Sequence, residues 1–141
     1  MTAPLPVPRV PAQTEGVLLI LRAESIVLFI AGVLLYLQLN GNALWLLPLL
    51  LAPDFSMIGY LRGSRLGAIT YNLVHNLATA LIVLAIGWFA AIAPLALAGA
   101  ILVAHVGMDR SLGYGLKLPT DSRTRTWDAS ADNGTDEPGN R

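Results

Sequence analysis

Ionisable residues stand inside long apolar segments of this 141-residue chain, and their chemical types could bind a metal ion or transfer protons. Two imidazoles, those of His75 and His105, are accompanied by three carboxylates, those of Glu24, Asp54 and Asp109. Imidazole nitrogens and carboxylate oxygens are ligands that zinc and other transition metals accept. Because an unpaired charge in apolar surroundings is costly, we expect these side chains to face one another inside the fold.

The spacing of these residues places several of them on shared helix faces. His105 and Asp109 are four residues apart, as are Tyr71 and His75, so each pair lies on one side of a helix. Asn72 extends the polar stripe around His75. The candidate polar cluster consists of Arg22, Glu24, Asp54, Tyr71, Asn72, His75, His105, Asp109 and Arg110. Within it, the candidate metal ligands are His75, His105, Asp109 and Asp54.

The composition indicates a small membrane domain. Hydrophobic residues make up 55% of the chain and charged residues only 13%, against about 25% in a typical soluble domain. The mean hydropathy is +0.61. A net charge of +0 gives no sign of a nucleic-acid partner, so the expected partner is the lipid bilayer. The absence of cysteine excludes disulfides and thiolate ligands.

Four apolar segments predict an all-α, four-helix transmembrane bundle over residues 16–117. The first segment alone would be roughly 36 Å long as a helix, which exceeds the hydrocarbon core of about 30 Å. Pro48 and Pro53 interrupt the second segment, so we expect a kink or partial unwinding near Asp54. The expected segments are 16–39, 44–61, 66–91 and 95–114.

The two ends of the chain differ in composition from the segments between them. Residues 1–15 contain four prolines and are expected to form a disordered leader, not a cleaved signal peptide, because they are poor in basic residues. Residues 118–141 are polar and are expected to form a disordered tail.

Loop charges predict the orientation in the membrane. Both termini and the central loop carry basic residues, whereas the loops near Asn40 and Pro94 carry no charge. By the positive-inside rule, both termini are cytoplasmic, in the inner membrane. The basic residues concerned are Arg9, Arg62, Arg65, Lys117, Arg123 and Arg125. Gly59, Gly63 and Gly67 have small-xxx-small spacing, which allows close helix contact or a homo-oligomer, although a turn explains them more simply.

Depth along the helices strengthens the prediction of a cluster. Glu24, Asp54, His75 and His105 each lie eight or nine residues from the cytoplasmic end of a segment, or roughly 12 to 14 Å below the boundary. Neighbouring helices lie about 8 to 10 Å apart, so these side chains could meet at one level.

Three ordered motifs resemble a small bacterial family of multi-helix membrane proteins, known as domain of unknown function 4260. They are APDFSMIGY at 52–60, GAITYNLVHN at 67–76 and AHVGMDRSLGYGLKLPT at 104–120. The resemblance covers about residues 18–120, and Arg22 and Glu24 are similar to the first-helix pair of that family. It implies a four-helix membrane protein and assigns no activity.

The sequence leaves several functions open, including whether the chain is an enzyme. The cluster could hold a divalent metal such as zinc and hydrolyse a lipid or phosphoester. It could instead be a structural network of hydrogen bonds and ion pairs, or a proton path in an oligomeric transporter. The sequence Gly113-Tyr114-Gly115 fits a helix C-cap better than a potassium filter. No serine lies in a G-x-S-x-G elbow.

Overall fold

The computed structural model describes residues 12–117 of the chain, and the side chains of residues 16–117. All regular secondary structure in this part is helical, as predicted. The helices are α1 (Ala12–Gln38), α2 (Ala43–Leu51), the 3-10 helix η1 (Ala52–Arg62), α3 (Ser64–Val74), α4 (Leu77–Phe89) and α5 (Ala93–Ser111). The tail predicted at 118–141 and most of the predicted leader lie outside the described residues.

The first helix begins earlier than expected. The leader was predicted to extend to residue 15, but α1 starts at Ala12. The last proline of the leader is Pro11, so from Ala12 onward no proline ring opposes the helical hydrogen-bond pattern.

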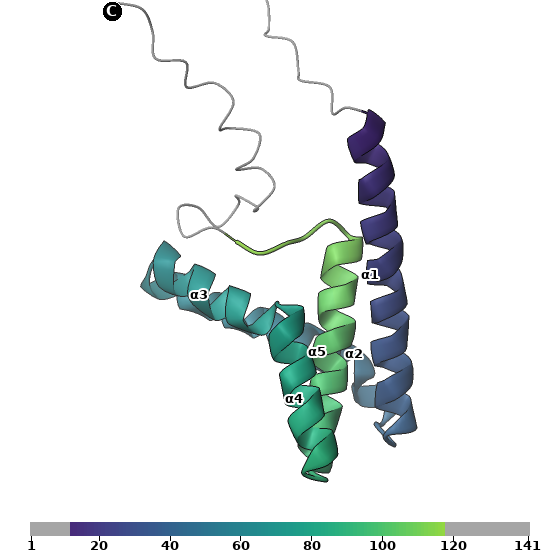
Figure 1. The fold of residues 1–141 in the computed structure, drawn as a ribbon. Coiled ribbons are helices and arrows are strands. Elements are labelled where there is room, and N and C mark those ends of the chain that lie inside the picture. The colour runs from purple at the N-terminus through teal and green to yellow at the C-terminus, as the bar shows by residue number, and fades with distance from the viewer. Residues whose placement is uncertain (1–11, 118–141) are drawn as a thin grey trace, which may run out of the picture.

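Helix α5 is the central element, and both α1 and α4 pack along it (Figure 1). Small residues of α5 permit close approach on both sides. A Cβ atom added to Gly107 would collide with the backbone of Phe29 in α1, and one added to Gly99 with the backbone of Leu84 in α4. Close backbone contact through small residues is typical of helix packing in membranes.

The third predicted helix, over 66–91, is wrong as a single element. It is divided into α3 and α4, which are bent by 48° relative to each other. Asn76 stabilises the break from both sides. Its Oδ1 accepts a hydrogen bond from the backbone N–H of Thr79 at 2.8 Å, and its Nδ2 donates to the carbonyl of Asn72 at 2.8 Å. The Asn76 side chain therefore satisfies backbone groups that the interrupted helix leaves open.

Near Asp54, where the sequence predicts a kink or partial unwinding, the helix type changes. Helix α2 contains Pro48 and ends at Leu51, and the chain continues as η1 with Pro53 in its first turn. Helix η1 packs against α3. Gly59 and Gly67 lie at this contact, since a Cβ on Gly59 would meet Thr70 and one on Gly67 would meet the ring of Tyr60. These glycines thus serve packing within the chain.

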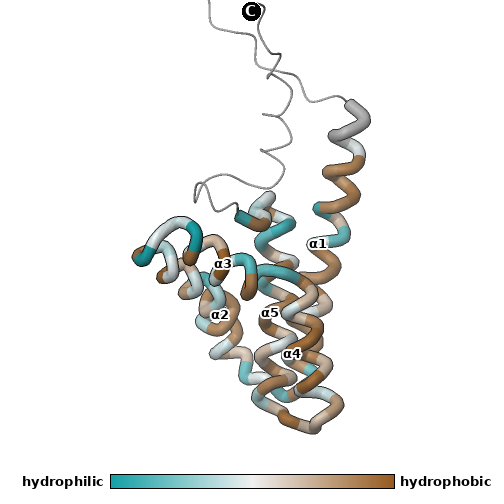
Figure 2. The backbone as a smooth tube through the Cα atoms, turned by 60° about the vertical axis from the view of Figure 1, so that its left-hand side comes forward, coloured by the Kyte–Doolittle hydropathy of each residue, from teal (hydrophilic) through white to brown (hydrophobic). Residues whose placement is uncertain are grey.

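Helix lengths and apolar surface are compatible with a membrane protein. Within the described residues, Gly16–Gln38, Ala43–Arg62 and Ala93–Ser111 are each long and apolar enough to span a bilayer, and α3 with α4 forms a fourth, bent candidate. Figure 2 shows hydrophobic residues along α1, α4 and α5, whereas hydrophilic residues gather around α3 and the junction of α3 and α4.

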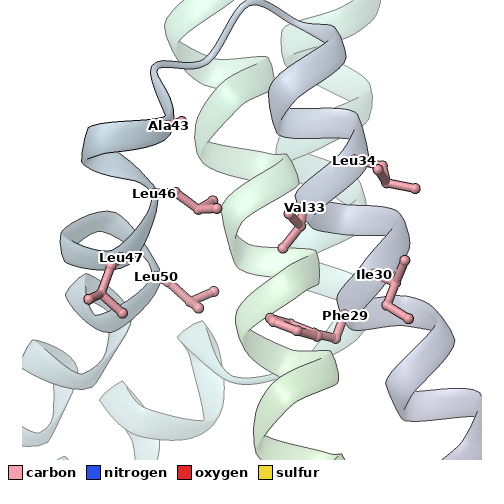
Figure 3. A pocket seen from close by; sticks show the side chains of 8 residues that line it. All are labelled: Phe29, Ile30, Val33, Leu34, Ala43, Leu46, Leu47 and Leu50. Atoms are coloured by element: carbon pink, nitrogen blue, oxygen red, sulfur yellow. The ribbon is translucent and has the colours of Figure 1, made fainter.

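An entirely apolar groove of about 300 Å³ lies between α1 and α2. Figure 3 shows Phe29 and Val33 of α1, and Leu46 and Leu50 of α2, directed into it. All eight lining side chains are hydrocarbon, so this groove has no group that could perform chemistry. It ends at Leu50, whose carbonyl contacts the polar cluster described next.

Candidate metal centre

Four candidate ligands predicted from the sequence come together at one place. Asp54 lies in the first turn of η1, His75 caps the end of α3, and His105 and Asp109 are one turn apart on α5. One ligand atom from each residue lies within 4.8 Å of the others. The two imidazoles are buried, and the side chains of Asp109 and Asp54 are 15% and 47% exposed. His75 lies at the break between α3 and α4.

Backbone carbonyls fix the tautomer of both histidines. Nδ1 of His105 lies 2.6 Å from the carbonyl oxygen of Leu50, and Nδ1 of His75 lies 2.9 Å from that of Tyr71. A carbonyl oxygen only accepts, so each Nδ1 carries the proton and donates it. In a neutral imidazole the lone pair then resides on Nε2, which faces the carboxylates in both cases. Metal-binding histidines are commonly oriented in this way.

The separations between these atoms match a four-coordinate centre. His75 Nε2 lies 3.4 Å from Asp54 Oδ1 and 3.7 Å from Asp109 Oδ2, while His105 Nε2 lies 3.6 and 3.5 Å from the same atoms. These are four of the six edges of the tetrahedron that the ligand atoms form, and all four atoms lie within 4.8 Å of one another. A regular tetrahedron with edges of this length would have its corners about 2.2 Å from its centre, close to the zinc–nitrogen and zinc–oxygen distances of about 2.0 to 2.2 Å. Charge-assisted hydrogen bonds are shorter, about 2.7 to 2.9 Å.

One buried atom in the group lacks a hydrogen bond. Among the described residues, Nε2 of His105 has no hydrogen-bond partner, although the whole side chain is inaccessible to solvent. Its nearest polar neighbours are carboxylate oxygens, which are acceptors when ionised. A lone pair that faces two acceptors indicates a place for a cation.

Tyr71 supports two of the ligands. Its hydroxyl donates to Asp109 Oδ2 at 3.3 Å, and its ring stacks on that of His75 with centroids 3.7 Å apart and planes at 13°. Such contacts orient ligands and are a regular feature of metal sites. The sequence-based placement of Tyr71 beside His75 therefore agrees with the structure.

Asn72 connects the cluster to the segment after α5. Its Nδ2 donates to the carbonyl of Lys117, and the backbone N–H of Lys117 donates to its Oδ1, both at 2.7 Å. The Lys117 ammonium lies 4.1 Å from the ring centroid of Tyr71. Burial lowers the pKa of Lys117, and the nearby carboxylates of Asp109 and Asp54 oppose that shift.

Sequence reasoning used Lys117 only as an orientation charge. The sequence signal for the position of Lys117 was Gly113, which forms a turn after α5. In this turn Gly113 has a φ of +89°, and the N–H of Tyr114 donates to the carbonyl of Asp109. This turn is the glycine C-cap expected from the sequence, and the chain then returns to Asn72.

Three residues of the predicted cluster lie outside this group of ligands. Arg22 and Glu24 are exposed on α1, and Arg110 is exposed near the end of α5. Among the described residues, none of the three forms an ion pair with the four candidate ligands. Arg22 lies instead near the turn after α5, because a Cβ on Gly113 would be 3.8 Å from its guanidinium nitrogen.

A comparison with sequence families decides the affiliation of the chain. Residues 18–126 match the family described as Domain of unknown function (DUF4260). The chain belongs to the DUF4260 family. The resemblance seen in the three motifs is thereby confirmed, and all four candidate ligands of this DUF4260 protein lie inside the matched region. No curated protein and no solved structure gives a significant match to the chain.

Proposed function

We propose that this DUF4260 protein is a metal-dependent hydrolase of the inner membrane, with a divalent ion such as zinc held by Asp54, His75, His105 and Asp109. The observation that carries the proposal is the buried Nε2 of His105, which has no hydrogen-bond partner in the described residues and faces two carboxylates. A divalent cation satisfies that lone pair and neutralises both carboxylates at once.

A structural network of ion pairs is the main alternative. It requires a proton between a histidine Nε2 and a carboxylate oxygen, held either as an imidazolium or as a carboxylic acid. The histidine side chains are 2% and 0% exposed, and a charge there is expensive without close partners. The four nitrogen–oxygen separations of 3.4 to 3.7 Å are long for such partners but fit metal coordination. The geometry therefore favours the metal.

The exposure of Asp54 supports a catalytic role over a purely structural one. Its side chain is 47% exposed and borders an open groove, so one side of the site is accessible to substrate and water. The four residues would hold the ion, which would polarise a water molecule. The second oxygen of the Asp54 carboxylate would accept the water proton while the water oxygen bonds to the phosphorus or carbonyl carbon of an ester. The bond to the leaving oxygen then breaks, and that oxygen receives the proton.

The proposed topology has four spans and cytoplasmic termini, with α3 and α4 together forming the third span. Charge along the fold supports it. Arg62 and Arg65 flank the junction of η1 and α3, and Lys117 follows α5 and bonds to Asn72 near the candidate metal centre. The uncharged turns between α1 and α2 and between α4 and α5 lie together at the opposite end of the long helices (Figure 1). The site would then face the cytoplasmic leaflet.

A proton path through the bundle has less support. The buried residues of α5 between its start and His105 are all apolar or glycine, including Ala100, Ile101 and Val103. A proton relay needs a chain of titratable groups or water at membrane depth. A site open at one end suits an interfacial enzyme better.

A hydrolysis assay with matched carboxylate variants tests the proposal. Full-length protein in detergent, supplied with zinc, should hydrolyse at least one of p-nitrophenyl phosphate, bis(p-nitrophenyl) phosphate and dioctanoyl phosphatidic acid. Asp54→Asn should lower kcat by about 100-fold or more, because both a metal ligand and the general base are lost. Glu24→Gln removes an exposed carboxylate outside the site and should leave kcat unchanged. Metal-loaded protein inactive on all three probes, or an active Asp54→Asn variant, would contradict the hydrolase.

A further inference from the structure

Lys117 is the single lysine of the chain, and a side chain of α3 holds its backbone in place. Both of its backbone polar groups bond to the side chain of Asn72, at 2.7 Å each. Asn72 precedes the cluster residue His75 on α3, so this pair holds Lys117 beside the candidate metal centre. Two short bonds to one amide fix both position and direction of the chain.

Within residues 16–117, the ammonium of Lys117 contacts aromatic rings and a sulfur atom and forms no ion pair. It lies over the rings of Tyr71 and Tyr60, at 4.1 and 5.5 Å from their centroids, and 3.8 Å from Sδ of Met57. Among the described residues, no carboxylate lies within 4.0 Å of it. Aromatic faces attract a cation through the electrostatics of the ring. Its N–H groups then remain available to donate hydrogen bonds to another ligand.

An apolar groove of about 520 Å³ lies along η1, and two of its lining residues connect it to Lys117 and to the candidate metal centre. Met57 lines it and also contacts the Lys117 ammonium, while Asp54 lines it at the metal side. The remaining lining residues are Leu51, Phe55, Ile58 and Leu61. Phe55 and Ile58 are 71% and 60% exposed, so the groove is open along η1.

We propose that this groove and Lys117 together bind a membrane lipid with an anionic phosphate headgroup, and that Lys117 recognises the phosphate next to the metal ion. The inference rests on the proposed function and narrows its substrate to a lipid phosphate. The acyl chain lies along the η1 groove, and the headgroup lies between Lys117 and Asp54.

Charge complementarity supports an anion at this place. Two carboxylates and one divalent ion cancel, and the neutral histidines add nothing. Lys117 then leaves one positive charge beside the ion, which a phosphate neutralises through charge-assisted hydrogen bonds. A free inorganic phosphate would satisfy the charges but leave the apolar groove unused, so the lipid is the occupant that fits both parts.

The test measures lipid binding to full-length, zinc-supplied protein in a neutral detergent, with the metal content of each sample determined in parallel. The probes are dioctanoyl phosphatidic acid, dioctanoyl phosphatidylcholine and inorganic phosphate, with binding followed by native mass spectrometry. Phosphatidic acid should bind at least about tenfold more tightly than either other probe, since neither combines an acyl chain with net negative charge.

Two pairs of variants separate the headgroup from the chain. Lys117→Gln should weaken phosphatidic acid binding roughly tenfold with metal content unchanged, and Lys117→Arg should retain most of it. Arg65→Gln removes an exposed cation on α3 and should have no effect. Ile58→Trp fills the groove and should weaken binding, whereas Ile69→Trp, at a similarly exposed isoleucine outside it, should not.

Each result has a definite meaning. Equal binding of phosphatidic acid by wild-type and Lys117→Gln proteins that both carry metal overturns the lipid inference and leaves the metal centre intact. Tight binding of inorganic phosphate alone also overturns it. Lys117-dependent lipid binding by a metal-free wild-type protein supports the lipid site and contradicts the metal centre.

Discussion

The rings of His75 and His105 meet edge to face, with centroids 4.7 Å apart and planes at 73°. At this angle both Nε2 atoms face the same two carboxylate oxygens, although the rings come from different helices. Each ring is held by a bond from Nδ1 to a backbone carbonyl, so its direction is independent of the carboxylates. The nitrogen half of the candidate metal centre is therefore preorganised by the fold.

The break between α3 and α4 should be necessary for that preorganisation. Asn76→Ala removes the side-chain cap of α4 and should cost about 1 to 2 kcal/mol of stability, and it should also lower zinc affinity because His75 is adjacent. Asn42→Ala removes the corresponding cap of α2 and is the matched control. Thermal stability and zinc affinity should both fall for Asn76→Ala, but only stability for Asn42→Ala. Unchanged zinc affinity in both variants would count against the role of the break.

The hydroxyl of Tyr71 should tune the metal without being a ligand. Tyr71→Phe keeps the ring that stacks on His75 and removes the donor to Asp109, so zinc affinity should fall by roughly 10-fold or more. Tyr36→Phe removes another partly buried hydroxyl, which donates to the carbonyl of Asn42, and should leave zinc affinity unchanged. Competition with a chromogenic chelator measures both. Equal zinc affinities in the two variants would show that the Tyr71 hydroxyl does not contribute to metal binding.

The orientation can be measured with reporter fusions. Fusions after Gly63 and after Lys117 should be active only with a reporter that works in the cytoplasm, and a fusion at Asn42 only with an external one, because basic residues border the first two sites. The reverse pattern would place the candidate metal centre at the outer leaflet.

The candidate ligands were predictable from the sequence because residue type and depth are both encoded in it. His75, His105 and Asp54 stand at similar depths in apolar segments, Asp109 follows His105 by one helical turn, and the structure brings the four within reach of one ion. Depth alone does not give the rotation of a helix about its axis. Glu24 has a similar depth, but α1 presents its neighbour Ser25 to the interior and leaves Glu24 exposed.

The break at Asn76 was not predicted because the hydropathy of 66–91 continues through it. A local signal existed, since Asn76 followed by Thr79 is a plausible N-cap, but the same residues also fit a polar stripe on a continuous helix. Which alternative is adopted depends on tertiary contacts of α3 with η1 and of α4 with α5. These contacts are long-range and cannot be inferred from local pattern.

Metal content is the most direct test of the central claim. Full-length protein purified in detergent, incubated with zinc and freed of excess, should contain about one ion per chain by elemental analysis. His105→Ala and Asp109→Asn should lose it, Glu24→Gln should retain it, and a chelator should lower the melting temperature of the wild-type protein. Wild-type protein that stays metal-free after this treatment, with a melting temperature insensitive to chelator, would contradict the account and identify the cluster as a structural network.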